Sequence, residues 1–152
     1  MRKVREARET DRDQLMSMRL SLWPEQTPEE LLEELDNLLS TGKSGTLPGA
    51  VLVSEDEDGA LTGFLEVGLR SHADGCDTAR PVGFVEGWFV QEVSRGQGIG
   101  TELMRAAEEW TRAQGCRELA SDTPIDNHAS QRAHEALGFE VADRCVHFCK
   151  AI

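Results

Sequence analysis

The stretch that decides the fold runs from Phe84 to Gly100 and reads FVEGWFVQEVSRGQGIG. An apolar run typical of a strand fills 84–90, a glycine-rich turn fills 95–100, and apolar residues then recur at helical spacing as far as Trp110. Glycines let a backbone approach an anion closely, and the N-terminus of a helix directs several N–H groups at one point. The stretch therefore predicts a strand, a phosphate-binding turn and an amphipathic helix in succession.

The turn differs from two common phosphate-binding loops. It has no Gly-Lys-Ser/Thr ending, so it is not the loop of an NTPase. It also follows several predicted strands rather than the first, which argues against a dinucleotide-binding fold. Taken alone, the turn is also compatible with a tight connection that binds nothing.

Working outward, hydrophobic periodicity and turn residues predict the other elements. Val4 begins a strand, Thr10 or Asp11 caps a helix that Pro24 ends, and a second helix starts near Thr27. The remaining predictions are strands at 50–53 and 61–69 joined through Asp58-Gly59, a strand at 82–90, a helix from 99 that Gly115 stops, a strand at 118–121, a helix at 127–137, and a final strand within 139–150. The order β-α-α-β-β-β-α-β-α-β predicts an α/β (α+β) fold whose mixed, mostly antiparallel sheet carries helices on both faces.

Composition narrows the function classes. The 152 residues suit one domain, 1–152, and the formal net charge is −12. Such a charge repels nucleic acid and anionic membranes and attracts cations, although acidity also serves solubility alone. No apolar run is long enough to span a membrane, and the N-terminus does not resemble a signal peptide, so a cytoplasmic location is expected. The four cysteines have no zinc-ligand spacing and are expected to be reduced, and no metal site is expected.

The glycine-rich turn, its flanking elements and the later segment Asn127 to Phe139 resemble the GCN5-related N-acetyltransferase (GNAT) superfamily. The resemblance implies a GNAT-like fold with acetyl-CoA as co-substrate. It places the pyrophosphate on the turn and the pantetheine arm beside strand 84–90 as an added strand. The cofactor-binding residues it implies are Trp88, Phe89, Val90, Arg95, Gly96, Gln97, Gly98, Gly100, Thr101, Asn127 and His134.

Four shorter stretches resemble one branch, the aminoglycoside 6'-N-acetyltransferases, which confer antibiotic resistance. They are LWP (22–24), FVEGWFV (84–90), ASDT (120–123) and HEALGF (134–139). This resemblance implies a polycationic amine acceptor, held by the substrate-binding residues Trp23, Glu86, Asp122 and Asp143, and a homodimer; His72 is a further candidate from this chain's own sequence. Glu86 and Asp122 are the candidate catalytic residues, because one carboxylate can remove a proton from the ammonium group while the other holds the cation.

Two departures from the family matter. Many members protonate the leaving thiolate with a tyrosine, whereas this chain has none and carries His134 at that position. The loop at 70–75 lacks the aromatic residues that the branch often carries, and His72 offers a polar contact there. Two alternatives stay open: an acetyltransferase for another amine (a polyamine, an amino sugar or a peptide), and a CoA-binding module without turnover.

Overall fold

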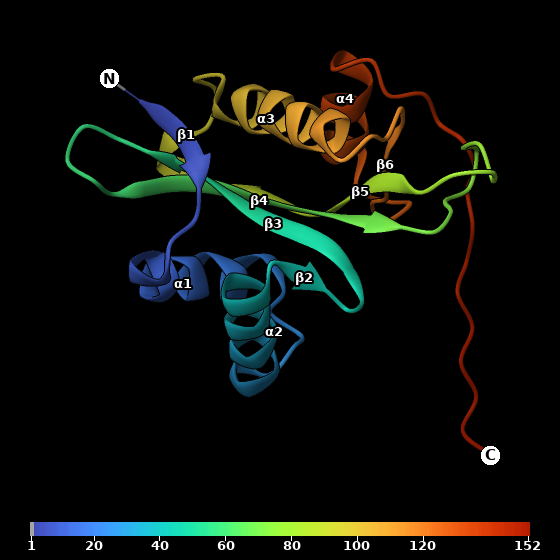
Figure 1. The fold of residues 1–152 in the computed structure, drawn as a ribbon, viewed down its shortest axis with the longest axis horizontal. Helices are drawn as coiled ribbons and strands as arrows, with labels where there is room; N and C mark the ends of the chain where they lie inside the picture. Colours follow the sequence, from blue (N-terminus) through green and yellow to red (C-terminus); the bar gives the residue numbers. More distant parts are fainter. Residues whose placement is uncertain (1) are drawn as a thin grey trace.

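A mixed sheet forms the centre of the protein in the computed structural model, which describes residues 2–152 (Figure 1). The strand order is β1-β3-β4-β5-β6, with the short β2 also paired to β3, and all pairs are antiparallel except β5 with β6. The strands are β1 (Lys3–Glu6), β2 (Lys43–Ser44), β3 (Leu47–Glu55), β4 (Leu61–Arg70), β5 (Val82–Val90) and β6 (Leu119–Ser121). The antiparallel strands and the single parallel pair confirm the mixed, mostly antiparallel sheet.

Helices cover both faces of this sheet, as predicted. One face carries α1 (Arg12–Leu22) and α2 (Pro28–Thr41), and the other carries α3 (Ile99–Ala113) and α4 (His128–Ala136) (Figure 1). Buried apolar side chains of α3, including Leu103 and Met104, form one core cluster with the sheet. Leu15 of α1 and Leu35 of α2 form a second cluster on the opposite face. The sheet therefore separates two hydrophobic core clusters, one on each of its faces.

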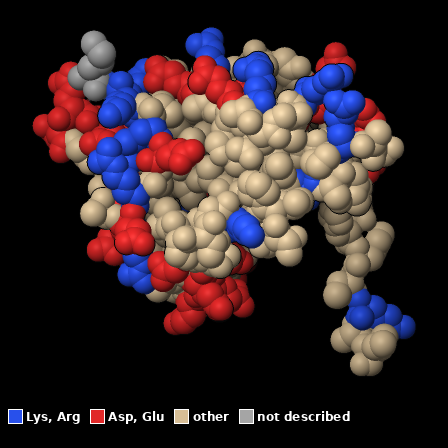
Figure 2. Space-filling model, in the orientation of Figure 1, with Lys and Arg blue, Asp and Glu red and all other residues tan. Residues whose placement is uncertain are grey.

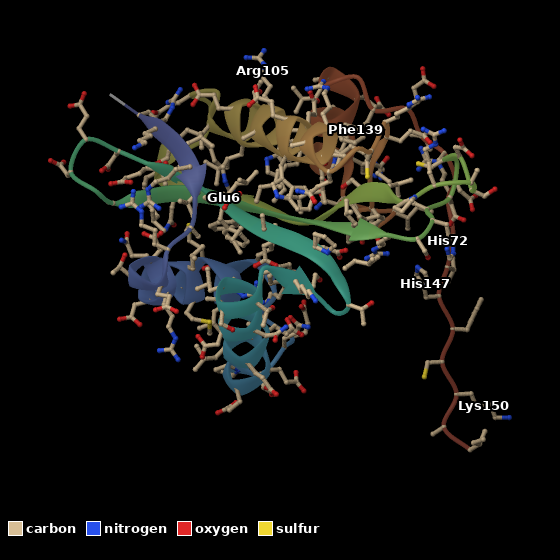
Figure 3. All side chains as sticks on the ribbon, in the orientation of Figure 1. Glu6, His72, Arg105, Phe139, His147 and Lys150 are labelled. Carbon is tan, nitrogen blue, oxygen red and sulfur yellow. The ribbon has the colours of Figure 1, made fainter. Side chains whose placement is uncertain are left out.

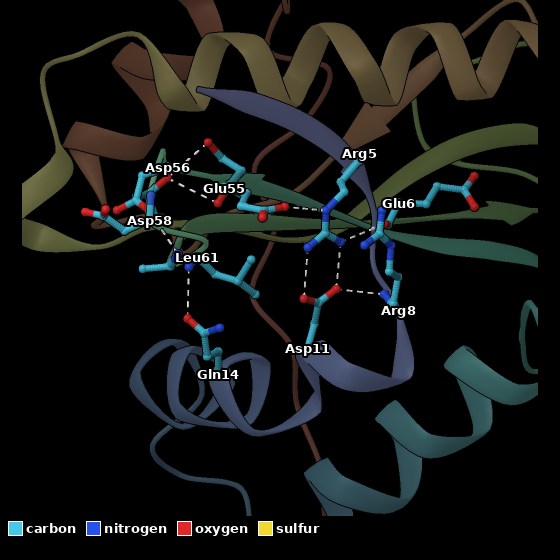
Figure 4. A network of polar contacts seen from close by, with 12 residues as sticks. Arg5, Glu6, Arg8, Asp11, Gln14, Glu55, Asp56, Asp58 and Leu61 are labelled. Carbon is cyan, nitrogen blue, oxygen red and sulfur yellow. Dashed lines mark hydrogen bonds and ion pairs between the residues drawn. The ribbon is translucent and has the colours of Figure 1, made fainter. Parts of the chain in front are cut away.

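A polar network ties the first strand to the first helix (Figure 4). The Arg5 guanidinium donates to both carboxylate oxygens of Asp11, at 2.7 and 3.0 Å, and to Glu55 of β3 at 2.6 Å. Asp11 also accepts from the backbone N–H of Arg8. The hydrogen bond from Arg5 holds the pKa of Asp11 below its usual range. Asp11 stands at the N-cap position of α1, but its carboxylate binds Arg5 and makes no cap bond.

One irregularity in the sheet positions a side chain that matters below. Val67 of β4 pairs with Val85 of β5, whereas the preceding Glu66 pairs with Gly87, so Glu86 is an extra residue in a β-bulge. A bulge bends its strand and re-aims side chains, and bulges are common beside active sites. Because of it, Glu86 and Gly87 both face α1, instead of alternating.

The prediction of a final strand within 139–150 is wrong for the single chain. No residue after Ala136 belongs to a helix or strand, and the chain from 140 to the end is exposed. Figure 1 shows this tail leaving the body beside β5 and β6 and ending in solvent. Local sequence patterns do not show whether a neighbouring strand is present, and a strand forms only where there is one with which to pair.

The surface is unevenly charged. Acidic side chains gather over α2 and over the turn between β3 and β4, whereas the tail carries few charges (Figure 2). All four cysteines are free thiols, as expected. No helix in the described part of the chain is long and apolar enough to cross a membrane.

Candidate active site

The glycine-rich turn forms an open cradle of N–H groups. Gly96 and Gly98 have φ of 77° and 82°, left-handed values that favour glycine, and Gly98 leads directly into α3. Within residues 2–152, no N–H group from 96 to 101 has a hydrogen-bond acceptor. A Cβ added at Gly96 would meet no atom within 4 Å. Residues 96–101, among them Gly100 and Thr101, therefore fit a phosphate group at the positive end of α3.

Two arginines fix the position of this turn from either side. Arg2 donates to the carbonyl oxygen of Gln97 at 2.9 Å and forms an ion pair with Glu102 at 2.7 Å. Arg95 donates to the carbonyl oxygen of Val90 at 2.9 Å, and its guanidinium lies over the Phe89 ring. The turn is thus attached to the N-terminal segment and to the end of β5. Sequence reasoning missed Arg2 because no local pattern connects residues 95 positions apart.

The strand before the turn has a free edge. β6 pairs with β5 only from Gly83 to Val85, so the half of β5 from Glu86 to Val90 has a neighbour on the β4 side alone. Its unpaired backbone groups face the gap between the two strands. An extended amide-bearing chain can pair with such an edge as an added strand. The free edge leads directly to the phosphate cradle, so the two features fit the two parts of one CoA molecule.

Trp88 and His134 close the far side of this gap. The Trp88 indole donates to the carbonyl oxygen of Gly100 at 3.1 Å, which ties β5 to the first turn of α3. The His134 ring meets the Trp88 ring edge-on at 5.2 Å. Its Nδ1 lies 2.7 Å from the carbonyl oxygen of Ser130, and its Nε2 lies 2.8 Å from Ser121 Oγ. A carbonyl only accepts, so Nδ1 carries the proton and Nε2 accepts from the serine hydroxyl. Both ring nitrogens of His134 are therefore engaged within the protein.

A cavity of about 570 Å³ opens on the opposite face of the sheet, between α1, α2 and the middle strands. Trp23 and Glu86, both predicted to bind substrate, line it together with Arg70. Trp23 packs directly on Gly87, where an added Cβ would lie 2.7 Å from two atoms of the indole ring. A glycine next to the bulge is thus what allows this ring to line the cavity.

Glu86 already holds a cation. Arg70 donates to its two carboxylate oxygens at 2.9 and 2.8 Å, and the Arg70 guanidinium stacks on the Phe84 ring at 3.5 Å. The hydrogen bonds that Arg70 donates to Glu86 are the main cause that raises the pKa of Arg70, and the charge of Asp122 adds to it. Asp122 follows β6 directly after Ser121, which pairs with Val85 at the point where the parallel pairing ends. Glu86 and Asp122 therefore both act on Arg70, but only Glu86 lines the cavity.

The cavity contains a second ion cluster that the sequence did not reveal. Arg19 of α1 is 2% exposed and contacts Glu66 of β4 and Glu34 of α2. Its guanidinium also lies over the Trp23 ring, 4.9 Å from the centroid. Burial is the main cause that lowers the pKa of Arg19. The cluster lies behind the aromatic wall. The charged residues that line the cavity balance one another, so the cavity is less acidic than the net charge suggests; they are the cations Arg19, Lys43 and Arg70 and the carboxylates Glu34, Glu66 and Glu86.

Like Asp122, three other predicted residues lie outside this cavity. His72 is exposed and contacts Ser71 Oγ at 3.0 Å. Asn127 caps α4, where its side-chain oxygen accepts from the N–H of Ser130. Asp143 is on the exposed tail, and its carboxylate accepts from the N–H of Arg144. The chain taken by itself does not bring Asp143 to Glu86 and Asp122.

Comparison with known proteins defines the class. The Acetyltransferase (GNAT) family matches residues 12–139, which contain the cavity wall, the bulge, the turn and α4. The chain therefore belongs to the GNAT family. The chain is accordingly an acetyl-CoA-dependent N-acetyltransferase.

Within that family, the similar proteins share one name. The chain is 45% identical over 144 residues to an aminoglycoside N(6')-acetyltransferase type 1 of Klebsiella aerogenes, covering 93% of each chain. It is 40% identical to the protein of that name from Stenotrophomonas maltophilia, covering 95% of this chain and 90% of that one. Among solved structures, AAC(6')-Iy in complex with the bisubstrate analogue CoA-S-monomethyl-acetylneamine has a TM-score of 0.89 and 31% identity, covering 100% of this chain and 99% of that one.

Proposed function

We propose that this protein transfers the acetyl group of acetyl-CoA to the 6'-amine of aminoglycosides, by direct attack of the amine on the thioester. The observation that carries the proposal is the meeting of two sites at the bulge. The acceptor cavity with Trp23 and Glu86 opens on one face of β5, and the free edge of the same strand leads to the phosphate cradle. Similarity to the aminoglycoside acetyltransferases supports the choice of acceptor.

The acceptor amine must lose a proton before it can attack. Both carboxylate oxygens of Glu86 accept from Arg70, so this carboxylate is already held in an ion pair. Asp122 is exposed, and its charge acts on Arg70, the partner of Glu86. We assign the base to Asp122, directly or through water, and the holding of an ammonium group to Glu86. Trp23 provides an apolar wall for a sugar ring.

Charge then develops on the thioester oxygen and on the leaving sulfur. The unpaired N–H groups of β5 at or near Trp88 are placed to donate to that oxygen. The chain has no tyrosine to protonate the sulfur. His134 donates to Ser130 and accepts from Ser121, so we assign it the positioning of β6 and α4 against Trp88. The thiolate then leaves without a proton from this residue.

The test is thiol release from acetyl-CoA with a panel of aminoglycosides, spermidine and short peptides, followed by location of the acetyl group on the product. We expect turnover only with acceptors that carry a free 6'-amine. Asp122→Asn should lower kcat at least a hundredfold, whereas Asp126→Asn, an exposed carboxylate in the same loop, should leave kcat unchanged. Turnover with peptides or polyamines alone would assign another acceptor. Tight CoA binding without any turnover would identify a non-catalytic module.

Two properties of the whole protein belong to the same proposal. We place it in the cytoplasm, where acetyl-CoA is available, and we propose a homodimer. The dimer is supported by the tail, whose apolar residues Val146 and Phe148 are exposed in the single chain.

A further inference from the structure

Glu102 is an unexpected residue beside a phosphate cradle. It lies in the first turn of α3, shortly after the glycine-rich turn. The positive end of a helix attracts any anion, so a free carboxylate there would compete with a phosphate group for the same field and would repel it. The net charge of −12 adds to the repulsion of an anionic cofactor. The cradle therefore needs a cation that cancels the charge of Glu102.

Arg2 supplies this cation. Its Nε and Nη2 atoms donate to the two carboxylate oxygens of Glu102, at 3.0 and 2.7 Å, and such a two-point pair fixes the direction of the carboxylate. The hydrogen bond from Arg2 is the main cause that lowers the pKa of Glu102. The charge of Arg105 lowers it further, but this side chain points from the outer side of α3 into solvent (Figure 3). Glu102 is therefore held as one half of an ion pair with Arg2.

The first strand brings Arg2 to this position. Val4 of β1 packs against the core cluster under α3. Side chains alternate along an extended chain, so Arg2 lies on the same face as Val4, whereas Lys3 and Arg5 face the other way. Arg5 accordingly binds Asp11, which precedes α1 on the opposite face of the sheet. The contact between Arg2 and α3 thus results from the pairing of β1 with β3, which fixes β1 beside the helix.

Arg2 also fixes one peptide group of the cradle. Its Nη2 donates to the carbonyl oxygen of Gln97 at 2.9 Å. A trans peptide is planar, so the carbonyl of Gln97 and the N–H of Gly98 point in opposite directions. Because the carbonyl is held toward Arg2, the N–H of Gly98 points away from it, and this N–H has no acceptor within residues 2–152. Gly98 alone would leave this peptide free to rotate, since glycine restricts φ so little.

We propose that Arg2 is a positioning residue for acetyl-CoA, which cancels the charge of Glu102 and keeps the N–H of Gly98 directed at the pyrophosphate. Arg2 acts through these two contacts and is not itself a ligand of the cofactor. This role rests on the part of the proposed function that places the pyrophosphate on the glycine-rich turn, and it does not depend on the acceptor.

Calorimetry with CoA tests this role without any turnover. Arg2→Gln removes the cation, and the matched control Lys3→Gln removes one positive charge from the next residue, on the other face of β1. We expect Kd for CoA to rise about tenfold in Arg2→Gln and to change less than about twofold in Lys3→Gln. Tm should change little in both variants, because an exposed ion pair contributes little to stability. An unchanged Kd in Arg2→Gln, or an equal loss in both variants, would overturn the proposal.

A double-mutant cycle tests whether Arg2 acts through Glu102. In the Glu102→Gln background there is no carboxylate to cancel, so removing Arg2 should raise Kd only about threefold, through the lost bond to Gln97. The same tenfold rise in both backgrounds would overturn the proposal, because Arg2 would then act on CoA through its own charge.

Salt separates the electrostatic effect from a purely structural one. The ratio of the two Kd values, Arg2→Gln over wild type, should fall from about tenfold toward about threefold as the salt concentration rises from ~0.01 to ~1 M, where the Debye length shortens from about 30 to about 3 Å. A ratio that does not change with salt would show that Arg2 only supports the local fold, and it would overturn the proposal.

A truncated donor completes the test. S-acetylpantetheine lacks the pyrophosphate, so its kcat/KM should be the same for wild type and Arg2→Gln, whereas KM for acetyl-CoA should rise about tenfold at unchanged kcat. An equal loss with both donors would place the effect of Arg2 at the reacting end of the cofactor and overturn the proposal. Absence of turnover with every aminoglycoside would reject the proposed acceptor, and the Kd values for CoA would still decide the role of Arg2.

Discussion

Adding one methyl group at Gly87 should displace the wall of the acceptor cavity. A Cβ there would lie 2.7 Å from Cη2 and Cζ2 of Trp23 and 3.2 Å from a methyl carbon of Leu22. Ordinary carbon contacts are about 3.5–4.0 Å, so the indole ring must move by roughly 1 Å. Gly68 provides the matched control, because its added Cβ would meet its nearest neighbour, Ser44, at an ordinary 3.5 Å.

The expected magnitudes follow from these contacts. Overpacking costs about 2 kcal/mol, and replacing a strand glycine by alanine returns roughly 0.5–1 kcal/mol. Gly87→Ala should therefore lose about 1–1.5 kcal/mol, which lowers Tm by about 3–5 °C for a chain of this size. Gly68→Ala should keep or slightly raise Tm. Because the Trp23 ring leaves its place in the cavity wall, kcat/KM for the aminoglycoside should fall about tenfold in Gly87→Ala alone, a loss of ~1.4 kcal/mol.

Thermal unfolding and steady-state kinetics measure both effects. The double variant Gly87→Ala/Trp23→Leu removes the indole ring with which the new methyl group clashes. It should therefore recover Tm without recovering kcat/KM. The reasoning would be refuted if Gly87→Ala kept both its Tm and its kcat/KM within error of the wild type. It would equally be refuted if Gly68→Ala lost as much activity, because the effect would then not depend on the contact with Trp23.

Three further outcomes are expected. Arg5→Leu should lower the free energy of unfolding by about 2 kcal/mol at pH 7. The pKa of Asp11 is depressed in the folded state, so the stabilisation from its ion pair with Arg5 is present above pH ~4 and is lost below it. Urea denaturation should therefore show that the stability difference between wild type and variant becomes smaller as the pH falls. Arg70→Gln should free the Glu86 carboxylate and so lower KM for a polycationic acceptor about threefold in initial-rate assays. An unchanged KM would show that the ion pair between Arg70 and Glu86 does not oppose binding of the acceptor. Gly98→Ala should weaken CoA binding about tenfold by calorimetry, since the left-handed backbone at φ 82° is less favourable for alanine by ~1–2 kcal/mol. The control Gly45→Ala, with φ 67° and an equally open surrounding, should leave CoA binding unaltered.

Much of the donor site could be predicted from local sequence. The strand at 82–90, the turn and α3 are contiguous, so periodicity and two glycines were enough to predict them. The acceptor site is different. Arg70 meets Glu86 only through the register of β4 with β5 and the bulge between them, and no spacing rule predicts a bulge. The final strand was predicted from local sequence, but a local pattern does not say which sheet a strand joins.

The ion pair between Arg70 and Glu86 has a consequence for the choice of acceptor. Arg70 already pairs with the Glu86 carboxylate, so an incoming ammonium group must displace the arginine in order to bind there. An acceptor with one ammonium group exchanges one contact for another and gains little. An acceptor with several ammonium groups has further charges that can pair with Asp122 and with the edge of the cavity. On the proposed function, we therefore expect the cavity to favour acceptors that carry several positive charges.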